Sequence, residues 1–237
     1  MTEGPAIWVT RTLPDASETG ARLRKLGYTP VIAPLLRVEP LTTKVNLAEA
    51  ARLIFTSRNA VRLFEPTGQA KTLPVFTVGD RTAEVARAAG YRHVQSAAGD
   101  VEALAKLIRS LPASMRQGDS LHLGALEPAG DLAGLVEGAG IALQHVALYR
   151  TAPTPADDVA DCLRASPRLA GVLIHSPKAA RAVLQSRFAL PADTCAVCIS
   201  RAAADALVPA GLRRVFVAAS PTEDAIFRTL VDHLPPR

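Results

Sequence analysis

Short apolar segments of strand length alternate with amphipathic segments of helix length along nearly the whole chain. Glycine or proline ends several of the helical segments, as at Gly27, Gly90 and Pro209. This alternation is typical of βαβ units, and it predicts the α/β fold class with parallel sheets. The apolar segments are Ile7–Thr10, Val31–Ala33, Leu53–Phe55, Val75–Val78, Leu121–Leu123, Val172–Ile174 and Val197–Ile199.

The second half of the chain repeats the first half with an offset that drifts only slowly. The segment Ile7–Arg11 matches Leu121–Ala125 at an offset of 114 residues. Further along, Leu53–Ser57 matches Val172–Ser176 at an offset of 119 residues. A repeat of this kind indicates an internal duplication. Two homologous α/β units predict two lobes with a cleft between them, and ligand-binding loops at the carboxyl ends of the strands.

Composition narrows the class of protein further. The chain has 237 residues, 49% hydrophobic and 21% charged, which is enough to bury a large core. Its net charge of +5 is scattered and aromatic residues make up only 4%, so a small polyanion is a better partner than nucleic acid. The chain has no apolar run of membrane-spanning length and its N-terminus lacks signal-peptide features. We therefore expect a cytoplasmic protein with no membrane partner.

Two motifs that imitate metal or redox sites have simpler explanations. Cys195 and Cys198 have redox-motif spacing, but on a strand residues three apart point to opposite faces, so we interpret them as buried structural cysteines. The acidic segment Asp157–Asp161 follows Pro155, where acidic side chains favour the start of a helix. The sequence therefore predicts neither a metal nor a cofactor.

Hydroxyl side chains follow several of the predicted strands. Each of them can cap the helix that comes next. Taken together, helix N-termini at one sheet edge can also bind anions through backbone N–H groups, and basic residues nearby would add charge. Tyr149 stands at a junction after a predicted strand and is either a core residue or a site residue. The hydroxyl residues are Thr10, Thr56, Ser57, Ser176 and Ser200, and the basic ones are Arg11, Arg58, Arg81, Lys178 and Arg201.

A series of short motifs spans the chain in a recognisable order. In that order and spacing, they resemble the uroporphyrinogen-III synthase family of tetrapyrrole (heme) biosynthesis along essentially the whole sequence. Since the family is poorly conserved, order and spacing carry more weight than identity. The motifs are Val9–Arg11, Pro34–Leu36, Phe55–Val61, Val78–Ala83, Gly99–Asp100, Leu148–Thr151, Ile174–Pro177 and Ser220–Asp224.

The resemblance implies two flavodoxin-like lobes joined by two extended connectors. One lobe would comprise residues 1–36 and 152–237, and the other residues 40–147. The connectors would lie near 37–39 and 148–151. Each lobe would then combine the first βαβ segment of one half with the remainder of the other half, and two thin connectors predict hinge motion.

The reaction implied by the resemblance converts linear hydroxymethylbilane into uroporphyrinogen III. Water is lost, the ring closes and the terminal D ring is inverted, which makes the enzyme a cofactor-independent lyase. Because the bilane cyclises unaided to the wrong isomer, the enzyme mainly holds a flexible polycarboxylate in one conformation, with modest acid assistance to the leaving hydroxyl. The implied partner is hydroxymethylbilane synthase, which would hand over the substrate, and we expect a monomer.

The resemblance also assigns roles to particular residues. Tyr149 matches the family's cleft tyrosine and is the candidate catalytic group. In place of a Gly-Pro-Thr-Thr segment common among relatives, the chain has Ile199–Ala203, so Ser200 or Arg201 would have to compensate. The remaining candidate substrate-binding residues are Thr10, Arg11, Thr56, Ser57, Arg58, Gly79, Thr82, Ser176 and Lys178.

A second class of function is compatible with the same sequence. A two-lobed, non-catalytic sensor or binding protein for a small anion would share the fold, because a fold does not imply chemistry. The departures near Ser200 would suit it. This alternative predicts ligand binding without turnover, whereas the enzyme predicts formation of isomer III.

Overall fold

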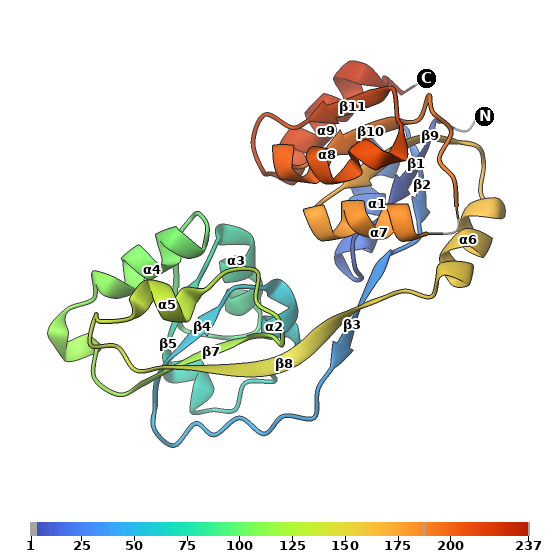
Figure 1. The fold of residues 1–237 in the computed structure, drawn as a ribbon. Helices are drawn as coiled ribbons and strands as arrows, with labels where there is room; N and C mark the ends of the chain where they lie inside the picture. Colours follow the sequence, from blue (N-terminus) through green and yellow to red (C-terminus); the bar gives the residue numbers. More distant parts are fainter. Residues whose placement is uncertain (1–3, 187, 237) are drawn as a thin grey trace. The chain divides into compact units, whose positions relative to one another are not determined.

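The computed structural model describes residues 4–186 and 188–236 and confirms the predicted α/β class, with two mostly parallel sheets. The chain divides into two compact units. Unit 1 contains the residues up to Arg37 and those from Ala152 onward, and unit 2 spans Val38–Thr151. In Figure 1, the darker blue segment that contains β1, α1 and β2 and the gold-to-red segments belong to unit 1, whereas the segments from the lighter blue after β3 through green to yellow belong to unit 2.

The sheet of unit 1 is built from five parallel strands. They are β1 (Ala6–Val9), β2 (Thr29–Ile32), β9 (Leu169–Ile174), β10 (Cys195–Cys198) and β11 (Arg214–Val217). Their order is β11-β10-β9-β1-β2, so β1 lies between β9 and β2. The helices are α1 (Asp15–Lys25), α6 (Ala156–Arg164), α7 (Pro177–Gln185), α8 (Arg201–Leu207) and α9 (Glu223–His233), with a short 3-10 turn η3 (Val208–Ala210).

The second sheet has six strands in the order β3-β8-β7-β4-β5-β6. Its strands are β3 (Leu36–Pro40), β4 (Ala50–Phe55), β5 (Pro74–Thr77), β6 (His93–Ser96), β7 (Asp119–Ala125) and β8 (Leu143–Pro153). The helices are α2 (Arg58–Leu63), α3 (Asp80–Ala88), α4 (Val101–Arg109) and α5 (Leu132–Val136), with 3-10 turns η1 (Ala70–Thr72) and η2 (Ala113–Met115).

Strands β3 and β8 carry the chain between the units. The N–H of Leu41 donates to the carbonyl of Leu148 at 2.9 Å, and the N–H of Thr154 donates to the carbonyl of Leu35 at 2.9 Å. One residue number rises while the other falls, so the two segments run antiparallel. The connecting segments are therefore paired strands.

The duplication predicted from the sequence is visible in the topology. Strand β9 follows β4 by 119 residues, and β10 follows β5 by 121 residues. In each sheet, a β-α-β pair from one half (β1 and β2, or β7 and β8) lies beside the remaining strands from the other half. A hydrogen bond repeats as well: Val78 N–H donates to Phe55 at 3.2 Å, and Ile199 N–H donates to Ile174 at 2.9 Å.

Each sheet is covered by apolar side chains on both faces, as parallel sheets require. In β10, Cys195 packs into one core cluster and Cys198 into the other, and both are fully buried free thiols. The prediction that these cysteines point to opposite faces is confirmed. The acidic residues Asp157 and Asp158 lie in the first turn of α6, also as predicted.

The two faces of the unit 2 sheet are lined by alternating residues of β4. Leu53 and Phe55 pack with Ala60 and Val61 of α2, whereas Ile54 packs against residues of α4 and α5. This alternation continues past the end of the strand and decides where the next polar side chains point.

The described residues contain neither a membrane-spanning helix nor a cluster of metal ligands. None of the helices in residues 4–186 and 188–236 combines the length and apolar character needed to cross a membrane. Within the same residues, no group of three or more His, Cys, Asp and Glu side chains is arranged to hold a metal ion.

Candidate active site

The candidate active site of unit 2 begins where β4 ends. Ser57 has extended backbone angles and caps α2, its Oγ accepting the N–H of Asn59 at 3.1 Å. The hydroxyl of Tyr149, which lies 92 residues away in β8, donates to the same Oγ at 2.9 Å. The structure thus brings together two residues that the sequence analysis selected independently.

Burial governs the acidity of Tyr149. Its side chain belongs to the apolar cluster between the sheet and α2, and the residue is only 5% exposed. Desolvation raises the pKa of the phenol, and the hydrogen bonds with Ser57 and Asn59 offset only part of that effect. Tyr149 therefore stays protonated near neutral pH and can donate a proton or a hydrogen bond.

On the opposite face of the sheet, Thr56 contacts His122, which in turn contacts a second histidine, His145. Its Oγ1 lies 3.0 Å from Nε2 of His122, and Nδ1 of His122 lies 3.3 Å from Nδ1 of His145. Burial, with a smaller contribution from His145, lowers the pKa of His122 to about 4, so its imidazole is neutral near pH 7. Thr56 and Ser57 thus connect two polar groups on the two faces of one strand end.

The neighbouring strand end carries Gly79 and Thr82. Because Phe55 of β4 pairs with Thr77 of β5, the loops after these strands share one sheet edge. Gly79 is the N-cap of α3 and supplies no side-chain cap. Thr82 is only 6% exposed, so its side chain lies mainly within unit 2.

Corresponding loops of unit 1 hold two capping serines. Ser176 caps α7 through the N–H of Ala179 at 3.0 Å, and Ser200 caps α8 through the N–H of Ala203 at 3.3 Å. The exposed guanidinium of Arg201 forms an ion pair with Asp205 at 3.0 Å. The capping role of the serines is therefore confirmed, and a capping serine leaves the other first-turn N–H groups without a partner inside the helix.

Thr10 does not occupy the position expected from the sequence. The residue is fully buried, and its hydroxyl donates to the carbonyl of Leu173 at 2.7 Å. Since β1 pairs with β9, this bond ties the two strands together. The hydroxyl of Thr10 is therefore used inside unit 1, and its role in substrate binding stays a prediction.

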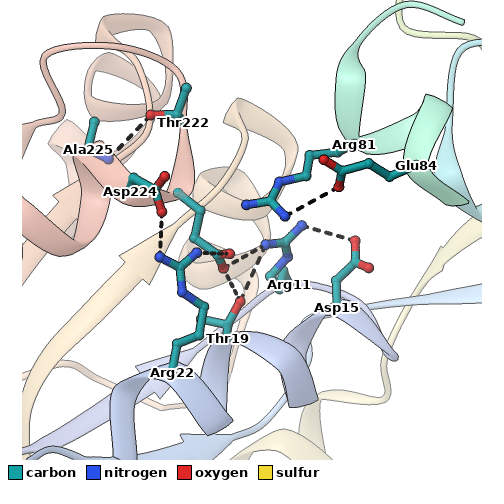
Figure 2. A network of polar contacts seen from close by, with 10 residues as sticks. Arg11, Asp15, Thr19, Arg22, Arg81, Glu84, Thr222, Asp224 and Ala225 are labelled. Atoms are coloured by element: carbon teal, nitrogen blue, oxygen red, sulfur yellow. Dashed lines mark hydrogen bonds and ion pairs between the residues drawn. The ribbon is translucent and has the colours of Figure 1, made fainter. Parts of the chain in front are cut away.

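Arg11 lies in an ion-pair network rather than alone (Figure 2). Its guanidinium contacts Asp15 at 3.0 Å and Glu223 at 3.1 Å. Arg22 joins the network through Glu223 at 3.0 Å and through Asp224. Two carboxylates already neutralise Arg11, so binding a substrate carboxylate would require it to exchange partners.

The family of the chain is decided by comparison with known proteins. The family model described as uroporphyrinogen-III synthase HemD matches residues 17–228, nearly the whole sequence. The chain belongs to the uroporphyrinogen-III synthase family. Members of this family are lyases that cyclise hydroxymethylbilane in heme biosynthesis, so the family, the reaction class and the enzymatic nature expected from the sequence are confirmed. A search of curated proteins gave no match.

Solved structures of uroporphyrinogen-III synthases share the fold. The Helicobacter pylori 26695 synthetase has 18% identity and a TM-score of 0.69, with 97% of this chain and 99% of that chain covered. A mutant synthase from the extremely thermophilic bacterium Thermus thermophilus has 18% identity and a TM-score of 0.55, with 97% of this chain and 98% of that chain covered. At this identity, the likeness supports the two-lobed architecture alone.

Sequence reasoning missed the contact between His122 and His145 beside Thr56. They are 23 residues apart, and no local motif links them. The signal was the spacing of the duplicated β-α-β pair, which places residues 23 apart on neighbouring strands: Ala6 pairs with Thr29 in one copy and His122 with His145 in the other.

Proposed function

We propose that this chain converts hydroxymethylbilane into uroporphyrinogen III with Tyr149 as the acid that assists departure of the hydroxyl group. The contact that carries the assignment is the 2.9 Å hydrogen bond from the Tyr149 hydroxyl to Ser57. It holds a buried, protonated phenol at the carboxyl end of β4. A substrate hydroxyl that replaced Ser57 as acceptor would receive the same hydrogen bond.

The proposed chemistry needs one proton at its first step. As the C–O bond breaks, its electron pair leaves with the oxygen, and the proton from Tyr149 completes the departing water. The remaining azafulvenium cation is attacked by the substituted carbon of ring D, which forms a protonated spiro-pyrrolenine. Fragmentation and reclosure invert ring D, and the proton lost at the end restores Tyr149. Positioning of the two ends of the linear bilane accounts for most of the selectivity for isomer III.

We propose that substrate carboxylates bind at helix N-termini that follow strand ends. First-turn N–H groups and the helix dipole favour anions, and the N-caps Ser57, Gly79, Ser176 and Ser200 all follow strand ends. The basic candidates are Arg58, Lys178 and Arg201. Thr82 supports the α3 turn from within, and Arg11 contributes only through its ion-pair network.

The remaining proposals concern the setting of the reaction. Hydroxymethylbilane would be handed over by hydroxymethylbilane synthase, and the chain would act as a monomer in the cytoplasm. Family membership supports the cytoplasmic setting. Sedimentation of the chain alone would test the monomeric state, and sedimentation with hydroxymethylbilane synthase would test the handover.

Product analysis tests the proposed function. Freshly generated hydroxymethylbilane is supplied, the products are oxidised to porphyrins, and isomers I and III are separated chromatographically. We expect isomer III to dominate with the wild-type chain and to fall strongly with Tyr149→Phe. Isomer I alone from a demonstrably folded sample would refute the synthase assignment and favour a non-catalytic anion-binding protein.

A further inference from the structure

A chain of hydrogen bonds leads from an exposed histidine to the end of β4. Nε2 of His145 lies 2.9 Å from the carbonyl oxygen of Ala125, Nδ1 of His145 lies 3.3 Å from Nδ1 of His122, and Nε2 of His122 lies 3.0 Å from Thr56 Oγ1. His145 is exposed, His122 is 3% exposed and Thr56 is partly exposed. All four residues belong to unit 2.

The chemistry of the partners fixes the direction of every bond in this chain. The Ala125 carbonyl can only accept, so Nε2 of His145 carries a proton. In neutral His145 the other nitrogen must accept, so Nδ1 of His122 donates. Because His122 is also neutral, its Nε2 has a lone pair and accepts the hydroxyl proton of Thr56.

We propose that Thr56 acts as a hydrogen-bond acceptor toward the substrate, taking an N–H group of the linear tetrapyrrole, and that His122 and His145 are positioning residues that keep it in this state. The Thr56 proton is committed to His122, so the oxygen has only lone pairs to offer. A carboxylate, which is also an acceptor, is therefore rejected at this point. This inference rests on the proposed function, because it names the substrate group that contacts Thr56.

The duplicated half shows that the fold does not need this histidine pair. At an offset of 114 residues, Trp8 corresponds to His122 and Val31 to His145. Both counterparts lie in an apolar core cluster, where Trp8 Nε1 donates to the Ala33 carbonyl at 2.8 Å. The same scaffold is thus stable with apolar residues at these positions, which points to a role for the histidines at the site.

Protonation of His145 would reverse two hydrogen bonds, the one between the histidines and the one between His122 and Thr56. A proton on Nδ1 of His145 makes Nδ1 of His122 the acceptor, so Nε2 of His122 donates to Thr56 and the threonine hydroxyl becomes a donor. A surface pocket of about 390 Å³ borders both rings, and Asp131 is the remaining titratable residue among those that line it. The carboxylate of Asp131 accepts the N–H of Gly134 at 2.9 Å.

The direction of the chain can be measured without substrate. Long-range proton–nitrogen NMR spectra of ligand-free protein labelled at the histidine nitrogens, at about pH 7.5, should show His122 protonated at Nδ1 and His145 at Nε2. Spectra of His122→Gln and His145→Gln assign the signals. Protonation of His122 at Nε2 would overturn the inference, whatever reaction the chain catalyses.

The role of Thr56 as an acceptor toward the substrate is tested with a double-mutant cycle of Thr56 and His122. Thr56→Val should raise KM about 3- to 10-fold, the loss of one hydrogen bond, with a smaller change in kcat. His122→Phe should raise KM in the wild-type background and add nothing in the Thr56→Val background. His93→Gln, an exposed position on β6, is the matched control and should leave KM unchanged.

Each outcome of the cycle bears on one proposal. Additive effects, or an unchanged KM in Thr56→Val with isomer III still formed, would overturn the role of Thr56 and leave the synthase intact. Absence of isomer III from the wild type would instead refute the proposed function. If His122→Phe fails to fold, the exposed His145→Gln replaces it, with a smaller rise in KM that again disappears in the Thr56→Val background.

Discussion

Two tyrosines in one core cluster offer a direct separation of catalysis from stability. Tyr149 and Tyr91 are 5% and 3% exposed and both pack into the apolar cluster on the α2 side of the unit 2 sheet. The Tyr149 hydroxyl donates to Ser57, whereas the buried Tyr91 hydroxyl has no hydrogen-bond partner among the described residues. Replacing each by phenylalanine removes one oxygen atom and keeps the ring.

The expected changes in stability have opposite signs. A buried hydroxyl without a partner costs about 1–3 kcal/mol, so Tyr91→Phe should recover most of that amount. The void left by one oxygen, roughly 10–15 Å³, subtracts only about 0.3 kcal/mol. Tyr149→Phe loses a satisfied hydrogen bond and should cost about 1 kcal/mol, because Ser57 keeps its bond from Asn59.

Thermal unfolding followed by far-UV circular dichroism measures both effects. For a chain of this size, about 1 kcal/mol shifts Tm by roughly 2–4 °C, so we expect a rise for Tyr91→Phe and a fall for Tyr149→Phe. The single tryptophan, Trp8, lies in unit 1, and its fluorescence in the native state should be unchanged by either substitution.

Activity should also separate the two variants. Tyr149→Phe should lower the rate of isomer III formation about 100-fold, the lower end of the usual general-acid contribution. Tyr91→Phe should keep the wild-type rate. Destabilisation by Tyr91→Phe would show that its hydroxyl is bonded in solution, and wild-type turnover by Tyr149→Phe would remove the phenol from the mechanism.

Three further predictions follow from particular contacts. Burial lowers the pKa of folded His122 to about 4, against an ordinary value of 6.5. The contribution of neutral His122 to the free energy of unfolding is therefore complete above pH 6.5 and is lost as the pH falls toward 4, by up to about 3 kcal/mol. Urea titrations at several pH values should show this pH dependence for the wild type and lose it in His122→Gln. Arg11→Met should cost about 1–2 kcal/mol at low salt because its two carboxylate partners are themselves partly buried, and a value near zero would show that the network contributes nothing. Gly118→Ala should cost more than Gly138→Ala by at least about 1 kcal/mol, because both glycines have positive φ but only at Gly118 would the new methyl meet an alanine Cβ at 2.7 Å; equal costs measured by denaturation would contradict this.

Most of the fold could be predicted from the sequence, because the duplication shows the same pattern of elements in both halves of the chain. Each apolar strand was recognisable from its pattern, and the slowly drifting offset linked β4 to β9 and β5 to β10. The edge strands β6 and β11 were not identified, because four-residue edge strands with exposed or half-exposed side chains carry little apolar signal.

The candidate site was only partly predictable. Tyr149 and Ser57 were selected from their positions after strands, but their contact depends on the register of β8 and β7, which no local pattern specifies. The inward hydrogen bond of Thr10 was not predicted, because a hydroxyl at a strand end can turn inward to a neighbouring strand as readily as outward. The histidine pair was missed because its members meet only through strand pairing.

The internal repeat supplies a further argument about where the chemistry resides. Ser57 and Ser176 occupy corresponding positions and both cap helices, so the cap is a requirement of the scaffold and cannot by itself indicate catalysis. The residues that differ between the copies are more informative: His122 stands where the other copy has Trp8, and Ala125 stands where it has Arg11. Arg11 is used in an ion-pair network of unit 1, while its counterpart Ala125 carries no charge. Of these two differences, only the one at His122 reaches the end of β4, where His122 contacts Thr56 and Tyr149 contacts Ser57.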